Sequence, residues 1–153
     1  MQDVSQNSDA YSREKRSEVM SRVRSKNTKP EVFVRSVLHR MGCRFRVHRK
    51  DLPGSPDIVL PKYGTVIFVH GCFWHQHPGC RKATIPKNNA DYWGPKLQRN
   101  FMRDRAAEAL LGELGWRVLT LWECEIPRED AALQEKLREE LRLATKEIRA
   151  DHL

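Results

Sequence analysis

Residues 66–80 read V-I-F-V-H-G-C-F-W-H-Q-H-P-G-C, and the rest of the chain is organised around this stretch. The apolar run at its start, together with Thr65, predicts a buried β-strand over 65–70. The strand leads directly into a loop that holds histidines, cysteines, Phe73 and Trp74, so few residues there serve only to fill space. The second half of the stretch is therefore a candidate functional site.

The composition favours a single basic domain. The chain has 153 residues, of which 39% are hydrophobic, and this suits one modest core. Lysine and arginine number 28 against 20 acidic residues, and the resulting charge of +8 favours a polyanionic partner, with nucleic acid ahead of membrane. We expect a disordered or loosely attached arm over 1–14, one domain over 15–149 and a tail over 150–153.

The sequence carries no signal for export or membrane insertion. No apolar run approaches the roughly 20 residues that cross a bilayer, and the N-terminus lacks the basic and apolar regions of a secretory signal. We therefore expect a cytoplasmic protein. In a reducing compartment, the four cysteines are better suited to metal binding or burial than to disulfide formation.

Upstream of the central stretch, the sequence predicts a helix over 29–41 that ends at Gly42. It begins with Thr28-Lys29-Pro30-Glu31, which matches a capping box with proline in the first turn, and apolar residues follow at helical spacing. Capping is a sufficient local explanation of Glu31. The next predicted element is a short strand over 44–48.

A basic segment over 13–29 surrounds Val19, Met20 and Val23. The pattern is typical of a solvated surface helix with one apolar edge, and spacing alone favours that interpretation. The alternative is an arm that grips DNA phosphates, with Met20 as a wedge between bases.

Two turns deliver Asp57 to the central strand. Residues 50–56 are turn residues, and Asp57 then heads a short strand over 58–60. A second turn connects this strand to the strand over 65–70, so the two should pair as an antiparallel hairpin. Asp57 is therefore expected to meet Val69 and His70 at one end of the sheet.

Downstream, the sequence predicts a helix over 92–114, a strand over 116–122 and an amphipathic helix over 127–149. A strand, a crossover helix and a strand form a right-handed parallel unit, so the two strands end at the same edge. This brings Cys124 to the loop that carries Cys72. Asp104 lies within the apolar stripe of the helix over 92–114. It is either a paired structural carboxylate or a site residue.

Four residues have the types and spacing of a structural zinc site. Cys72, His77 and Cys80 lie in one loop, and the predicted topology supplies Cys124. A closed Cys₃His set leaves no position for a substrate water. The alternative is a catalytic zinc with three ligands, which a cysteine-rich site suits poorly because thiolates reduce the Lewis acidity of the metal.

The remaining residues of the loop suit hydrolysis of a phosphodiester. Asp57 beside His70 and His75 combines an oxygen ligand for Mg²⁺ with imidazole groups that can accept a proton from water. Phe73 and Trp74 form either a small core or a wedge between base pairs. Trp93 is likewise either a core residue or a further stacking group.

Three blocks of this sequence resemble the very short patch repair endonucleases: 52–57, 66–75 and 114–124. The resemblance implies a restriction-endonuclease-like α/β fold with a central mixed sheet flanked by helices. It also implies a monomer that nicks double-stranded DNA 5′ to the thymine of a T·G mismatch left by deamination of 5-methylcytosine. Implied partners are a cytosine-5 DNA methyltransferase and mismatch-repair factors, with a nucleoid location.

The resemblance also assigns roles to individual residues. Asp57 and the Val69 backbone carbonyl bind Mg²⁺, His75 acts on the attacking water, and His70 supports the site. Glu31 and Asp104 match acids of the family's site. Phe73, Trp74 and Trp93 match residues that intercalate beside the mismatch, Met20 matches the wedge from the minor groove, and Cys72, His77, Cys80 and Cys124 match the zinc ligands. This chain departs from the family's histidine run by one additional residue before Cys80. A zinc-stapled DNA-binding module without catalysis is the alternative function.

Overall fold

The computed structural model describes residues 26–151, so the predicted arm over 1–14 and the basic segment around Met20 lie outside the described residues. Three helices and four strands are found in this part of the chain, which gives the predicted α/β class. In chain order they are α2 (Lys29–Arg40), β1 (Arg46–Val47), β2 (Ile58–Leu60), β3 (Thr65–His70), α3 (Ala90–Glu113), β4 (Arg117–Trp122) and α4 (Asp130–Asp151).

The strands form one mixed sheet in the order β1-β2-β3-β4. Strands β1 and β2 pair antiparallel, and β2 and β3 form the predicted antiparallel hairpin across a four-residue connection. Strand β4 pairs parallel with β3, from Thr65 opposite Arg117 to His70 opposite Trp122. The segments that follow β3 and β4 therefore leave the sheet at the same edge.

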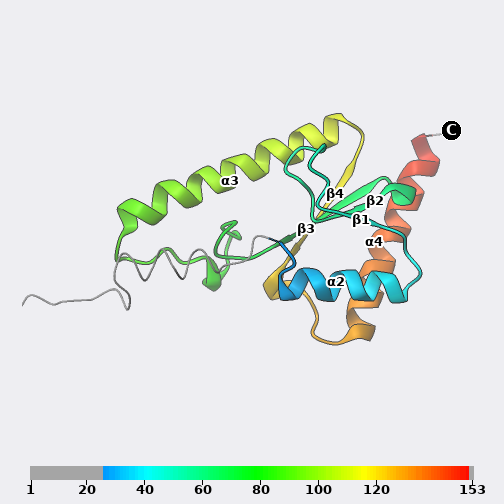
Figure 1. Cartoon of the computed structure of the whole chain (residues 1–153), viewed down its shortest axis with the longest axis horizontal. Helices are drawn as coiled ribbons and strands as arrows, with labels where there is room; N and C mark the ends of the chain where they lie inside the picture. Colours follow the sequence, from blue (N-terminus) through cyan, green and yellow to red (C-terminus); the bar gives the residue numbers. More distant parts are fainter. Residues whose placement is uncertain (1–25, 152–153) are drawn as a thin grey trace, which may run out of the picture.

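Helices cover both faces of the sheet, which explains why every residue of β2 and β3 is buried. Side chains alternate along β3: Ile67 and Val69 belong to the core cluster with α2 and α4, whereas Val66 and Phe68 pack with Leu111 of α3. Figure 1 shows α3 above the sheet and α2 below it. Within residues 26–151, no helix is long and apolar enough to cross a membrane.

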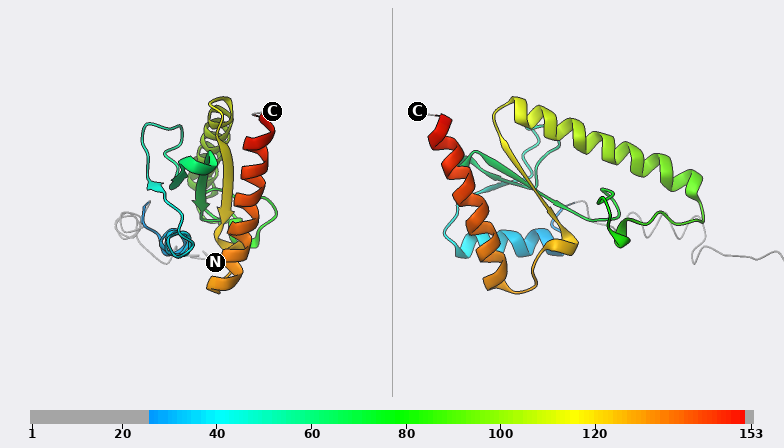
Figure 2. Two further views of the ribbon diagram at one scale, coloured as in Figure 1. Left: turned by 90° about the vertical axis from the view of Figure 1, so that its right-hand side faces the viewer. Right: turned by 180° about the vertical axis from the view of Figure 1, so that it is seen from behind.

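Helix α3 extends well beyond the sheet. Its first half and the loop over 71–89 project together from the sheet edge, as two opposite views show (Figures 1 and 2). Its second half packs on the sheet and on the turn at Gly54, where an added Cβ atom would lie 2.7 Å from that of Ala107. Glycine thus permits the close approach that fixes the turn before Asp57 against α3.

The structure corrects one element. The strand predicted over 44–48 is limited to Arg46–Val47. His48 has a φ of 48°, a left-handed conformation that does not continue a strand.

Candidate functional site

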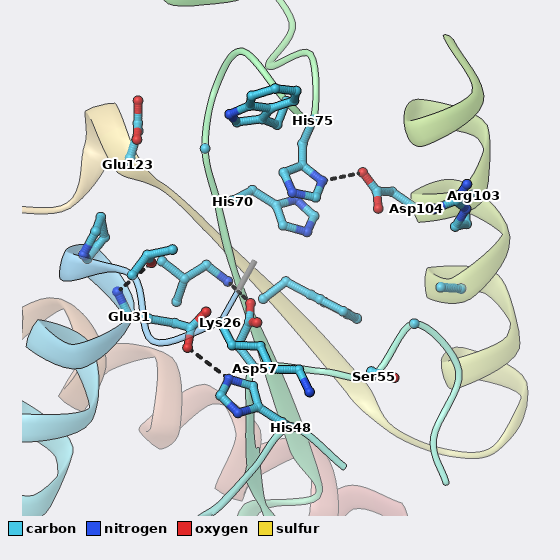
Figure 3. A pocket seen from close by; sticks show the side chains of 18 of the residues that line it. Lys26, Glu31, His48, Ser55, Asp57, His70, His75, Arg103, Asp104 and Glu123 are labelled. Atoms are coloured by element: carbon cyan, nitrogen blue, oxygen red, sulfur yellow. Dashed lines mark hydrogen bonds and ion pairs between the residues drawn. The ribbon is translucent and has the colours of Figure 1, made fainter. Parts of the chain in front are cut away.

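A cavity of about 830 Å³ opens between the start of α2, the end of β3 and the middle of α3. Three acids and three histidines line it, as Figure 3 shows: Glu31, His48, Asp57, His70, His75 and Asp104. Five of these six residues are predicted site residues. Segments separated by more than 70 residues in the chain thus contribute to one site.

Asp57 lies at the head of β2, beside the end of β3. Its Oδ2 accepts a hydrogen bond of 2.7 Å from the backbone N–H of Val69, so the predicted meeting of these residues is confirmed. Burial raises the pKa of Asp57 to about 7; the Val69 hydrogen bond opposes this, and the nearby charge of Glu31 adds to it. A cation bound here would relieve the cost of holding two carboxylates together.

Glu31 is only 1% exposed, although it lies in the first turn of α2. Its backbone N–H donates to the Thr28 hydroxyl at 3.4 Å, as the capping motif predicts. Its carboxylate accepts from the Asn27 backbone N–H at 3.0 Å and contacts Nε2 of His48 at 2.9 Å. Capping therefore explains the hydrogen bond of the Glu31 backbone but not the position of its side chain, which reaches into the cavity (Figure 3).

His48 also lines the cavity, although the sequence does not mark it as a candidate site residue. Its place in an apparent strand gave no sign of a contact with Glu31, which lies 17 positions earlier. The left-handed backbone at His48 turns the chain out of β1, and its N–H donates to the Asp57 carbonyl at 3.3 Å. The only feature of the sequence that points to His48 is that a histidine lies in a turn before a candidate acid.

His70 and His75 stack face to face, with ring centroids 3.8 Å apart and planes inclined by 2°. Nδ1 of His75 lies 2.7 Å from Oδ2 of Asp104, so Asp104 is both a paired carboxylate and a lining residue of the cavity. Burial lowers the pKa of His70 to about 3, and the proximity of His75 contributes to the shift. His70 is therefore neutral at physiological pH.

The cysteine and histidine cluster lies just beyond this cavity. Ligand atoms of Cys72, His77, Cys80 and Cys124 all lie within 4.8 Å of one another. Sγ of Cys80 is 3.9 Å from Sγ of Cys124, which in turn is 3.4 Å from Nδ1 of His77. Tetrahedral zinc would require separations of about 3.8 and 3.5 Å, so the donor set fits this metal.

The cluster forms despite the additional residue before Cys80. Gln76 and Gly79 adopt left-handed conformations, with φ of 50° and 72°, and the turn they make brings Cys80 back toward His77. The predicted approach of Cys124 to the loop is confirmed, because the parallel pairing of β3 and β4 directs both segments to one edge. The ring of His77 also stacks on Trp122, with centroids 4.2 Å apart.

The loop aromatics form a separate cluster with α3. Rings of Phe73, Trp74 and Trp93 contact one another edge to face, with centroids 5.2 to 5.8 Å apart. All three are partly exposed and belong to neither core cluster of the described residues. Nζ of Lys96 lies 5.8 Å from the centre of the Trp74 ring. The cluster presents aromatic surface and positive charge at the same place.

Together these features define a class of protein. Buried acids and a histidine pair gather in one cavity of an α/β domain, and Lys26, Lys50 and Arg103 also line it. Such a site suits hydrolysis of an anionic substrate.

Comparison with known proteins makes the class specific. Residues 8–82 match the family described as DNA mismatch endonuclease Vsr. The chain is 55% identical to the type II nicking enzyme V.XorIIP of Xanthomonas oryzae over 130 residues, which are 85% of this chain and 94% of that protein. It is 39% identical to the DNA mismatch endonuclease Vsr of Escherichia coli over 133 residues, 87% of this chain and 85% of that protein.

The type II nicking enzyme V.NmeAIP of Neisseria meningitidis is a further relative, 46% identical over 129 residues, which are 84% of this chain and 91% of that protein. The chain belongs to the Vsr family of DNA mismatch endonucleases, as the resemblance in its sequence indicated. It is a DNA-cleaving hydrolase.

Proposed function

We propose that this protein nicks one strand of double-stranded DNA on the 5′ side of the thymine in T·G mismatches, in a reaction that depends on Mg²⁺. Family membership supports DNA as the substrate. The observation that carries the catalytic assignment is Asp57, a buried carboxylate bonded to the end of β3 in the cavity that also holds Glu31 and the His75–Asp104 pair. The proposed product ends are a 3′ hydroxyl and a 5′ phosphate.

Asp57 and Val69 are the proposed ligands of magnesium. Oxygen donors are what this ion prefers, and Glu31 adds a second carboxylate to the same wall of the cavity. The N–H and C=O groups of a strand residue point to the same side, so the Val69 N–H bond to Asp57 supports use of the Val69 carbonyl. When bound there, the ion would stabilise negative charge on the phosphate and on the leaving 3′ oxygen.

His75 is the proposed acceptor of a proton from the attacking water. If Nδ1 of His75 donates to Asp104, the neutral ring has Nε2 free to accept a proton. The stacked ring of His70 fixes the plane of His75, and because His70 is neutral it adds no opposing charge. Asp104 then stabilises the imidazolium that forms.

The other elements are proposed to hold the mismatch. Phe73, Trp74 and Trp93 would intercalate beside the T·G pair, and Met20 would enter from the minor groove. The cluster of Cys72, His77, Cys80 and Cys124 would bind a structural zinc ion that keeps the loop in place. The mixed sheet with helices on both faces is compatible with a restriction-endonuclease-like fold.

We further propose that the enzyme acts as a monomer, with residues 15–149 as its single domain. A cytosine-5 DNA methyltransferase would be its functional companion, because deamination of the methylated base creates the mismatch. Mismatch-repair factors would process the nick.

The test is cleavage of a labelled duplex. With Mg²⁺, the zinc-loaded protein should nick the T-containing strand of a T·G duplex and leave a matched T·A duplex intact. Asp57→Ala should abolish nicking while zinc content and folding are retained. If the wild-type protein shifts the T·G duplex without cutting it, the alternative of a non-catalytic DNA-binding module holds; nicking by Asp57→Ala would refute the metal assignment.

A further inference from the structure

His48 contacts both acids of the cavity wall, through different atoms. Its ring Nε2 lies 2.9 Å from Oε2 of Glu31, and its backbone N–H donates to the Asp57 carbonyl. The His48 side chain is 15% exposed and that of Glu31 is 2% exposed, so water competes little for this contact. Figure 3 shows His48 below Glu31 and Asp57, on the same wall of the cavity.

Two donors converge on one oxygen of Glu31. Oε2 accepts from the Asn27 backbone N–H at 3.0 Å and contacts His48 at 2.9 Å. Both Asn27 and His48 have left-handed backbones, with φ of 56° and 48°. Asn and His adopt this conformation more readily than most residues other than glycine. Two left-handed turns thus bring polar groups of Asn27 and His48 to the same carboxylate oxygen.

We propose that His48 is a positioning residue that holds the Glu31 carboxylate beside Asp57 for metal binding. The proposal rests on the proposed function of Asp57 as a metal ligand. With Oε2 engaged by His48 and Asn27, the Glu31 carboxylate has a fixed orientation beside Asp57, with which it also forms a side-chain hydrogen bond. A buried carboxylate without such donors would have several rotamers and would bind a cation less tightly.

A role of His48 as a direct metal ligand agrees less well with the geometry. Its Nε2 is already engaged by Glu31, and the contact would have to break for the same atom to bind a cation. Ligands of magnesium are mostly oxygen atoms, which Glu31 and Asp57 supply. The geometry therefore favours action through Glu31.

The test measures binding of Mn²⁺ alone to the zinc-loaded full chain, by calorimetry or by electron paramagnetic resonance. His48→Ala should weaken Mn²⁺ binding about 10- to 100-fold, as is usual when a partner of a ligating carboxylate is lost. His48→Gln, whose amide can still donate to Glu31, should stay within a few-fold of wild type. His39→Gln, on the exposed side of α2, is the matched control and should bind as wild type.

A double-mutant cycle separates action through Glu31 from other effects. In a Glu31→Gln background, His48→Ala should weaken Mn²⁺ binding little further, because the carboxylate it positions is gone. Full additivity, or wild-type affinity in His48→Ala, would overturn the proposal. Circular dichroism monitors folding, and if His48→Ala is unfolded, the cycle is run with His48→Leu and judged by the same two outcomes.

The cycle is independent of nicking. If the wild-type protein does not cleave the T·G duplex, but the effects of His48→Ala and Glu31→Gln on Mn²⁺ binding are not additive, the proposed function is refuted and the role of His48 stands. If the wild-type protein nicks the T·G duplex and the two substitutions have additive effects on Mn²⁺ binding, the role of His48 is refuted and the proposed function stands.

Discussion

Asp57 is a carboxylate that the fold buries beside another one. Burial raises its pKa to about 7, and Glu31 adds to the shift. In the unfolded chain the same group ionises near its ordinary value of 3.8. The native protein therefore holds Asp57 protonated over a pH range in which the unfolded chain holds it charged. Stability that Asp57 contributes below about pH 4 is lost as pH rises through about 7.

Asp57→Asn should therefore stabilise the protein in a buffer without divalent cations, and only at high pH. Asparagine keeps an oxygen that can accept from the Val69 N–H but carries no charge. At pH 8 we expect a gain on the order of 2 kcal/mol, since each pKa unit corresponds to about 1.4 kcal/mol and the side chain keeps some contact with water. At pH 4 the gain should be close to zero.

Thermal unfolding at the two pH values measures this effect. Asp51→Asn is the control, because Asp51 is exposed and its contact with Arg49 lowers its pKa, so it should give no gain at pH 8. An equal change for Asp57→Asn at both pH values would show that charge burial is not the cause. Cation binding should restore the advantage of the native carboxylate.

The sequence identifies the acids of the candidate site but not the residues that hold them in place. Turn residues and a short strand define the place of Asp57. The pattern leaves Asp104 open between a structural carboxylate and a site residue, and the resemblance to the family favours the second. The contact of His48 with Glu31 depends on two left-handed backbones, and neither Asn27 nor His48 belongs to a motif that announces one. Capping is a sufficient local explanation of Glu31, and only the resemblance to the family marks it as a candidate site acid.

The parallel pair of β3 and β4 determines where the cluster of Cys72, His77, Cys80 and Cys124 forms. The loop after β3 and the turn Glu123–Glu125 after β4 leave the sheet at one edge, and Cys124 thereby meets cluster members more than 40 residues earlier in the chain. Zinc would join these two segments where few backbone hydrogen bonds do. Its contribution to stability should be large because the loop over 71–89 has little core of its own.

Cys124→Ser should therefore remove zinc and destabilise the protein by more than about 3 kcal/mol. Serine has nearly the same shape but is a poor zinc ligand. Cys43→Ser is the matched control: Cys43 packs against the core away from the cluster, so this variant should keep its zinc. Elemental analysis and thermal unfolding measure both effects, and stoichiometric zinc in Cys124→Ser would remove this residue from the ligand set.

Elements with a clear hydrophobic period were predicted closely. The predicted strands over 58–60 and 65–70 match β2 and β3, and the three predicted helices differ from α2, α3 and α4 by no more than three residues at either end. The predicted strand over 44–48 is longer than β1, because the residues of this segment alternate in polarity and no sequence signal marks its end. Sequence periodicity reports which face is buried, whereas the turn at His48 is fixed by tertiary contacts.

The two ends of the described domain differ. The first half of α3 and the loop over 71–89 lie at one end in Figure 1, and α4 lies at the other. These two segments carry the rings of the aromatic cluster. Basic residues of α3 line a second hollow of about 570 Å³ beside the aromatic cluster: Lys96, Arg99 and Arg103. Charge alone predicts a polyanionic partner but does not say which face binds it, since arginines on α4 contribute to the same total. Because Lys96, Arg99 and Arg103 gather on α3, we predict that this face contacts the DNA.

This layout predicts different effects for arginine and tryptophan on DNA binding. Each phosphate contact releases counterions, so loss of one contact should lower the slope of log affinity against log salt by about 0.9. Arg99→Ala should therefore weaken binding to T·G and T·A duplexes equally and reduce the slope by that amount. Trp74→Ala should leave the slope unchanged and weaken binding to the T·G duplex selectively, because stacking beside the mismatch carries no counterion release.

Arg142→Ala on α4 is the control for the charge change. Arg142 is exposed and paired with Glu139 on the far side of the sheet from α3, so its loss should alter neither the slope nor the affinity by more than a small amount. Binding is measured without Mg²⁺ at several salt concentrations, so that cleavage does not interfere. An equal loss of slope in Arg99→Ala and Arg142→Ala would mean that net charge, and not the α3 face, governs the encounter with DNA. A reduced slope confined to Arg99→Ala would place the DNA backbone along α3, next to the cavity that holds Asp57.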